Sequence, residues 1–356
     1  MSAIITHRVD PALVWNRYRH NFSRHLLGVA RYVQTRMMHT LQAQCGHTDL
    51  RLGFSPYITL LGAGDKRLSE LADILGISRQ ACNQAVKQVE AAGYITRTAD
   101  PVDGRAKQLT LSPRGIQLRR DGIHIVTQLD QAFAGIVGDT QMTDTSKSLG
   151  KIYRHLSLGL SLHTAQPGAQ PSSTLFGALL PRLSDYILQR LMELTRAAGH
   201  TGLKLSFGQV LTLIGPAGGR IQQMAAAHDV SKQAISAIAM ELEESGYLQR
   251  QVDPMDARQV VLYFTARGQQ LIANSVASVD KLEAEFAMVI GKAALKRMNA
   301  TVHELYRGLH LEQDIFEHKG TVDISLLARQ LQQQLGKRES QELARLLLAP
   351  SGNTRL

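Results

Sequence analysis

The chain has 356 residues, 44% hydrophobic and 20% charged, which is enough apolar material for packed cores and excludes a wholly disordered protein. At about 100 to 200 residues per domain, this length predicts two domains. The formal net charge of +10 favours a polyanionic partner, either nucleic acid or a membrane surface.

Two cysteines cannot form a disulfide framework, and residues 1–15 lack the basic start and apolar core of a secretory signal. The longest uncharged stretch, residues 156–181, contains several helix-breaking residues, so no transmembrane segment and no membrane partner are expected. We therefore expect a cytoplasmic protein.

The sequence repeats itself at a spacing of 153 residues. Residues 68–115 align without a gap on residues 221–268, and fifteen of these 48 positions are identical. A repeat of this spacing predicts two modules of about domain size. We expect a first domain at 1–165, a linker at 166–173, a second domain at 174–311 and a C-terminal helical tail at 312–356.

The tail has no counterpart in the first repeat. Asp323 is a candidate N-cap for a helix that Gly336 closes. The apolar residues of this helix fall on one stripe, and they are Ile324, Leu327, Leu331 and Leu335.

Each repeat begins with two short helices. In the first repeat, residues 68–75 predict one helix and residues 76–78 predict a turn that ends in an N-cap. The second helix begins at Arg79, and helical spacing turns its apolar residues Cys82, Val86 and Val89 inward. The matching inward residues of the second repeat are Ile235, Ala239 and Leu242. Two short helices joined by such a turn are typical of a helix-turn-helix.

Two strands follow these helices. Gly93 ends the second helix, residues 94–98 alternate as a strand does, and Asp103-Gly104 is a hairpin turn signal. The chain returns through residues 107–111 to a long helix that begins at Ser112-Pro113. We therefore expect a mainly α fold with small β-hairpin wings, in which two winged helix-turn-helix domains share a helical core of dimerisation type.

Three motifs recur in the same order in both repeats: GY after the second helix, DPxDxR in the wing and RG in the long helix. They lie within LADILGISRQACNQAVKQVEAAGYITRTADPVDGRAKQLTLSPRG and MAAAHDVSKQAISAIAMELEESGYLQRQVDPMDARQVVLYFTARG. These residues resemble the MarR-type winged-helix transcriptional regulators, and with flanking helices the likeness covers most of residues 10–311. Members of that family are usually homodimers, so two such units in one chain imply a covalent pseudo-dimer. The resemblance implies sequence-specific binding to double-stranded DNA by a bacterial transcriptional regulator, and we expect a repressor.

A helix in the major groove needs donors that reach base edges, and Arg, Gln and Asn have suitable geometry. Phosphate contacts suit Lys side chains and the N-terminus of the second helix. The minor groove suits the arginine of the wing. The candidate DNA-binding residues are Ser78, Arg79, Gln80, Asn83, Gln84, Lys87, Arg105 and Lys107 in the first repeat, and Ser231, Lys232, Gln233, Ser236 and Arg258 in the second.

The two repeats differ in charge. Residues 68–120 carry eight Lys and Arg against five Asp and Glu, a net charge of +3, whereas residues 221–273 carry four against six, a net charge of −2. We therefore expect the first repeat to dominate DNA affinity. The operator should be an imperfect palindrome with half-sites about 10 bp or a multiple apart.

The resemblance also implies a small aromatic or phenolic effector, lodged between the dimerisation helices and the winged helix. Trp15, Tyr18, Tyr32 and His39 fall in one predicted long first helix. Because an aromatic stripe belongs to a core more often than to a ligand site, the sequence does not identify the ligand residues.

Cys45 is a candidate redox residue, because a neighbouring imidazolium from His47 would lower the pKa of its thiol. Cys82 aligns with Ile235 on the inward face, and we expect a small buried hydrophobic residue there.

The sequence lacks the HExxH, GxSxG, GxxxxGK[ST] and strand-linked GxGxxG motifs, so we expect no metal site, no cofactor and no enzymatic activity. The alternative function is a protein-interaction or adaptor module in which DNA binding by the second domain is degenerate and a partner docks through the tail. The net charge of −2 in the second repeat favours this alternative locally. The salt dependence of DNA binding separates the two functions.

Overall fold

The computed structural model describes residues 11–99, 107–158, 175–215, 218–228, 230–253 and 256–311. These residues are mainly helical with two small antiparallel sheets, as the sequence predicts. They divide into two compact units, and α8 (Phe176–Ala197) and α12 (Ala266–Ile290) contribute to both. Of the described residues, the larger unit takes those within Phe22–Ile187 and Glu283–Leu309, and the smaller unit takes 11–21, those within Leu188–Leu282, and His310 and Leu311.

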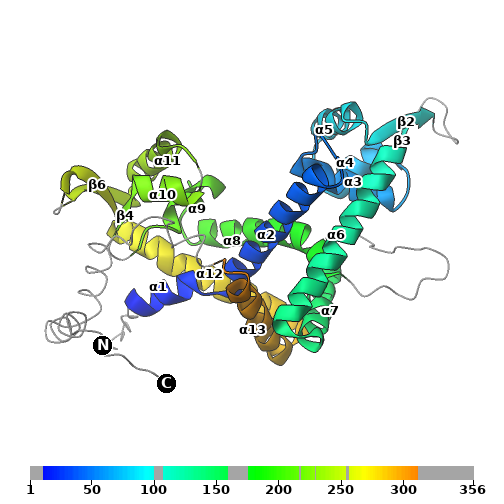
Figure 1. The fold of residues 1–356 in the computed structure, drawn as a ribbon. Coiled ribbons are helices and arrows are strands. Elements are labelled where there is room, and N and C mark those ends of the chain that lie inside the picture. Colours follow the sequence, from blue (N-terminus) through cyan, green and yellow to red (C-terminus); the bar gives the residue numbers. More distant parts are fainter. Residues whose placement is uncertain are drawn as a thin grey trace, which may run out of the picture. The chain divides into compact units, whose positions relative to one another are not determined.

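The larger unit holds the first repeat and the last described helix (Figure 1). Besides the parts of α8 and α12, its elements are α2 (Phe22–Ala43), η1 (Leu52–Phe54), α3 (Ser55–Gly62), β1 (Lys66–Arg67), α4 (Leu68–Leu75), α5 (Arg79–Ala91), β2 (Ile95–Ala99), β3 (Lys107–Leu111), α6 (Pro113–Val137), α7 (Asp139–His155) and α13 (Lys292–Gly308).

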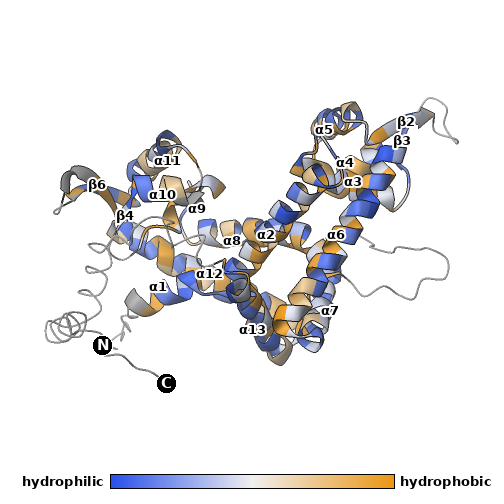
Figure 2. Ribbon diagram, viewed as in Figure 1, coloured by the Kyte–Doolittle hydropathy of each residue, from blue (hydrophilic) through white to orange (hydrophobic). Residues whose placement is uncertain are grey.

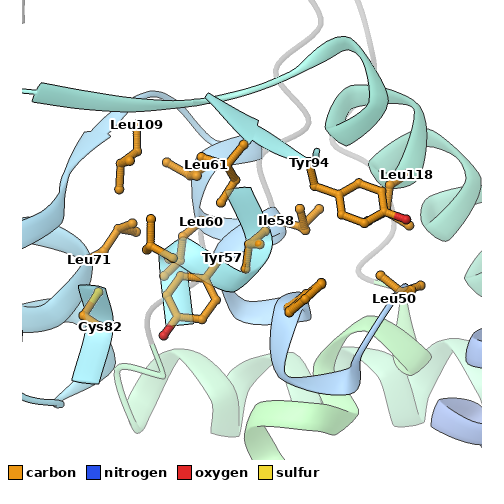
Figure 3. Packing of buried hydrophobic residues seen from close by; sticks show 14 of the residues in the cluster. Leu50, Tyr57, Ile58, Leu60, Leu61, Leu71, Cys82, Tyr94, Leu109 and Leu118 are labelled. Atoms are coloured by element: carbon orange, nitrogen blue, oxygen red, sulfur yellow. The ribbon is translucent and has the colours of Figure 1, made fainter. Parts of the chain in front are cut away.

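The strands of the larger unit form a three-stranded antiparallel sheet in the order β1-β3-β2. Ile95 pairs with Leu111 and Ala99 with Lys107, so β2 and β3 make the expected hairpin, with β2 beginning one residue later than predicted. The hairpin and helices α3, α4 and α5 enclose one hydrophobic core (Figure 3), in which Leu71, Cys82 and Leu109 are fully or almost fully buried.

The helical part of the larger unit joins segments from both ends of the described chain. Helix α13 packs against α2, α6 and α7. Aromatic rings contribute to this packing, with Phe22 edge-on to Phe286 at a centroid distance of 6.2 Å. Helices α6 and α7 carry alternating hydrophilic and hydrophobic residues (Figure 2), because one face of each enters the core while the other meets solvent.

The smaller unit contains the second three-stranded sheet, in the order β4-β6-β5. Besides the parts of α8 and α12, its elements are α1 (Pro11–Arg19), η2 (Leu205–Phe207), α9 (Gly208–Leu211), β4 (Gly219–Arg220), α10 (Ile221–His228), α11 (Lys232–Glu244), β5 (Leu248–Asp253) and β6 (Asp256–Phe264). Its core includes Ile235, Ala239 and Leu242 on the inward face of α11 and Tyr247 beside them.

The predicted long first helix is in fact two helices, α1 and α2. The side-chain amide of Asn21 donates to the carbonyl oxygens of Arg17 and Tyr18, at 3.2 and 2.9 Å. These hydrogen bonds satisfy carbonyls at the end of α1, where the helix has run out of backbone donors. The sequence pattern missed this end because Asn21 lies within an otherwise continuous helical periodicity.

The GY and RG motifs meet at one junction, which explains why they recur together. Gly93 has a φ of +80°, a left-handed conformation that favours glycine. The backbone of Gly115 lies so close to Tyr94 that a Cβ at this position would be 2.1 Å from the Tyr94 carbonyl oxygen. The Arg114 guanidinium lies 4.8 Å from the centroid of the Tyr94 ring. At the matched junction of the second repeat, a Cβ on Gly268 would be 2.1 Å from the Tyr247 carbonyl oxygen, and the Arg267 guanidinium lies 4.9 Å from the centroid of the Tyr247 ring.

Candidate nucleic-acid interface

Helices α4 and α5 are held at fixed positions by their ends. Glu70 accepts the backbone N–H of Arg67 at the start of α4, at 2.6 Å, and Gly76 leaves α4 with a φ of +66°. The Oγ of Ser78 then accepts the N–H of Ala81, at 3.1 Å, and begins α5. The inward residues Cys82, Val86 and Val89 are fully buried, which confirms the predicted register.

This register exposes the opposite face of α5. The exposed residues on this face include the predicted contacts Ser78, Arg79, Gln80, Gln84 and Lys87. Within the described part of the chain, neither Arg79 nor Lys87 forms an ion pair. The exposed face of α5 therefore combines an N-terminal turn, amide donors and uncommitted cations.

Asn83 differs from its neighbours because it is half-buried. Its Oδ1 accepts a hydrogen bond from the Arg97 guanidinium of β2 at 3.3 Å, and Arg97 also donates to Glu90 at 2.8 Å. Arg97 thus ties the wing to α5. Arg97 is not among the residues predicted from the sequence, although its identity with Arg250 of the second repeat was a usable signal.

The wing presents Lys107 at the start of β3, where the side chain is exposed. Residues 100–106, including the predicted minor-groove residue Arg105, lie outside the described residues.

In the smaller unit, α11 is capped in the same way, since the Oγ of Ser231 accepts the N–H of Ala234 at 3.1 Å. Ser231, Lys232 and Gln233 are exposed and Ser236 is half-buried. Arg258 lies within β6, and its side chain is outside the described set. Lys204 and Glu241 form an ion pair beside α11.

A cavity of about 460 Å³ lies in the larger unit between α2, α3, α4, α6 and α8. Its wall is mainly apolar and includes Ile74 and Leu75 of α4. Three arginines and one carboxylate also line it, and these are Arg51, Arg119, Arg182 and Asp185. Burial raises the pKa of Asp185, while the charge of Arg182 acts in the opposite direction. A mostly apolar cavity with a few charged groups has the character of a small-molecule site.

The aromatic residues considered at the sequence level do not line this cavity. Trp15 packs against Tyr18 and Phe264, with centroid distances of 5.4 and 5.5 Å, and Tyr32 packs against Phe133 at 6.2 Å. His39 is exposed on α2.

The expected lowering of the pKa of the Cys45 thiol is not found. The thiol is exposed, but its pKa is raised, first by desolvation and then by the charge of Asp121. The Nε2 of His47 pairs with Asp121 at 2.9 Å, and His47 is not among the groups that shift the pKa of Cys45. The expected burial of Cys82 is confirmed, and burial raises the pKa of its thiol.

None of the helices in the described residues is both long and apolar enough to span a membrane. Within the same residues, no three His, Cys, Asp or Glu side chains are grouped so that they could hold a metal ion.

The segment from α3 to the wing decides the family likeness. Residues 58–106 match the model of the MarR family. This MarR-type segment contains α4, α5 and β2, and therefore the exposed face of α5. Comparison with curated proteins returns no match.

Three solved structures are similar over parts of the chain. A MarR-family transcriptional regulator from Rhodococcus sp. RHA1 is 26% identical, with 39% of this chain and 96% of that chain covered and a TM-score of 0.31. The transcriptional regulator Tm0710 from Thermotoga maritima is 24% identical, with coverages of 36% and 90% and a TM-score of 0.29. CouR from Rhodococcus jostii RHA1, bound to p-coumaroyl-CoA, is 25% identical, with coverages of 41% and 94% and a TM-score of 0.30.

Proposed function

We propose that this chain is a transcriptional regulator that binds double-stranded DNA in a sequence-specific manner through the MarR-type segment. The observation that carries the proposal is the exposed face of α5, where Arg79, Gln80 and Gln84 stand on a helix that buried residues and a serine cap hold in register. Arg and Gln reach base edges in the major groove, while Lys87 and the N–H groups after Ser78 suit phosphate. The protein acts as a repressor and needs no enzymatic activity.

The second repeat supplies the other half of a single-chain pseudo-dimer. Support comes from the recurring serine cap at Ser231 and the recurring Gly268–Tyr247 junction, which give α11 and its hairpin the same local geometry as α5 and the first wing. Lys232 and Gln233 add weaker DNA contacts, because the surrounding window has a net charge of −2. The operator is an imperfect palindrome.

A small-molecule effector occupies the cavity of the larger unit and releases the DNA. The cavity supports this part of the proposal because Ile74 and Leu75 of α4 form part of its wall, and α4 packs directly against α5. A ligand that prefers one placement of α4 therefore changes the DNA affinity by its difference in affinity for the two placements. The apolar wall suits an aromatic body, and the three arginines suit an acidic group.

The alternative function, an adaptor with degenerate DNA binding in the second repeat, is favoured by one observation: α11 exposes Met240 where α5 exposes Lys87. A titration of duplex DNA at several salt concentrations distinguishes the functions. A DNA-binding regulator loses affinity steeply as salt rises, with a slope of about 0.9 per neutralised phosphate on logarithmic axes. Weak binding at every salt concentration would support the adaptor and contradict the proposal.

A further inference from the structure

At two of three matched positions around α11 and its hairpin, a cation of the first repeat is replaced by an apolar residue in the second. At the spacing of 153 residues, Lys87, Ala99 and Lys107 correspond to Met240, Val252 and Val260. The latter three side chains, called the apolar face below, are 53%, 62% and 39% exposed. Two cations that suit phosphate in the first repeat are therefore replaced by exposed hydrophobic residues in the second.

These three side chains gather around one ion pair. Arg250 of β5 donates to Glu243 of α11 at 2.5 Å, which brings the hairpin against the helix. Val252 lies two residues after Arg250 and so points to the same side of the strand, and Val260 is its direct cross-strand partner. Met240 lies one helical turn before Glu243 on the same face of α11. The apolar face is thus a single surface on both sides of the Arg250–Glu243 pair.

This surface is poorly suited to a phosphate backbone, because it offers no cation at the positions that Lys87 and Lys107 occupy in the first repeat. Apolar side chains gathered at one exposed place are stabilised by an apolar partner.

The C-terminal tail, residues 312–356, lies outside the described residues, and its sequence contains a candidate apolar partner. Its predicted helix carries the stripe Ile324, Leu327, Leu331 and Leu335 and needs an apolar surface to cover it. The predicted helix from Asp323 to Gly336 carries one acidic and one basic residue, Asp323 and Arg329, and two cations, Lys337 and Arg338, follow it directly. The predicted helix and the apolar face are therefore complementary in hydrophobicity.

The tail also begins in the right place. Leu311, the last described residue, belongs to the smaller unit, as α11 does. Twelve residues separate Leu311 from Ile324 and reach about 40 Å when extended, more than the roughly 35 Å diameter of a domain of this size. A tether of this length gives an effective concentration on the order of millimolar, so the tail outcompetes a second copy of the chain at micromolar concentration.

We propose that the helix predicted from Asp323 to Gly336 docks on the apolar face. Its leucine stripe covers Met240, Val252 and Val260, and its basic end at Lys337 and Arg338 lies beside the exposed carboxylate of Glu244. The docked tail occupies the place in the second repeat that corresponds to the phosphate sites of Lys87 and Lys107 in the first, and it restricts DNA contact by the second repeat. This inference goes beyond the proposed function, since DNA binding by α5 does not depend on it.

The test measures the reactivity of a thiol placed on the apolar face of the full chain. All variants carry Cys45→Ser, and Cys82 is retained because its side chain is fully buried. Alkylation of M240C is compared with and without L327D and L331D, which place charges on the stripe. We expect the tail substitutions to speed alkylation at least about tenfold, which corresponds to a docked state populated about ten to one. The matched control M288C, on an α12 residue that is 81% exposed, should react at the same rate with either tail.

A second measurement identifies the occupant. Mild oxidation of the double variant M240C/L331C should give a disulfide within one chain, detected by intact mass, faster than oxidation of M288C/L331C. Equal alkylation rates of M240C with both tails would overturn the proposal. Disulfides formed mainly between chains would overturn it in favour of a second copy, and protection of M240C by duplex DNA but not by the tail would overturn it in favour of a DNA surface.

Discussion

Asp130 on α6 provides a quantitative test of the helical packing in the larger unit. Its carboxylate oxygens accept the backbone N–H groups of Phe176 and Gly177 at the start of α8, at 2.7 and 3.0 Å. Burial raises the pKa of Asp130 to about 6, although both hydrogen bonds act to lower it. The ionised carboxylate is therefore held at a net cost that Asp130→Asn removes.

The size of that cost follows from linkage. A pKa of about 6 in the folded chain, against about 3.9 in the unfolded chain, means that the folded chain binds more protons between these values. The stability contributed by protonated Asp130 is fully present below about pH 4 and is lost as the pH rises through 6, by about 3 kcal/mol in total. About 2 kcal/mol of this change falls between about pH 4.5 and pH 7.5.

Urea unfolding followed by circular dichroism, for the natural protein and D130N across this pH range, measures the change. The asparagine also leaves one backbone N–H without an acceptor, which adds a penalty that does not vary with pH. We therefore expect the stability difference between the two proteins to shift by about 2 kcal/mol in favour of D130N as the pH rises. A stability difference that stays constant across the pH range would refute the contact between Asp130 of α6 and the start of α8.

Three further experiments test the junction and the interface. Gly115→Ala should lower the free energy of unfolding by about 2 to 4 kcal/mol, because its Cβ would meet the Tyr94 carbonyl, whereas Gly135→Ala in the same helix has open space and should not destabilise; equal effects in urea unfolding would contradict this junction. Lys87→Met, which installs the residue found at position 240, should weaken binding to all DNA sequences and reduce the salt slope by about 0.9 in an anisotropy titration; an unchanged slope would remove Lys87 from the phosphate contacts. Arg79→Ala should reduce specific affinity about 10- to 100-fold while Lys232→Ala reduces it less than about threefold, and equal losses would refute the dominance of the first repeat.

The local structure of the MarR-type segment could be read from the sequence because short-range patterns determine it. Ser78 is a strong N-cap, and the spacing of Cys82, Val86 and Val89 set which face of α5 is buried. The same spacing placed Arg79 and Lys87 in solvent, where the structure has them.

What the sequence missed depends on contacts between distant residues. Asn83 was expected on the open face, but Arg97, fourteen residues away, lies against it and accounts for its partial burial. The pKa of Cys45 was expected to be lowered, but it is raised, first by desolvation and then by the charge of Asp121, which lies far along α6 and pairs with His47. The packing of α13 against α2 likewise joins residues that no local periodicity relates.

Selection of bound fragments from random duplex DNA tests the central claim most directly. The account predicts enrichment of an imperfect inverted repeat with half-sites about 10 bp or a multiple apart, and loss of the stronger half-site in R79A. Enrichment of no sequence by the natural chain, or the same enriched sequence in R79A, would contradict it.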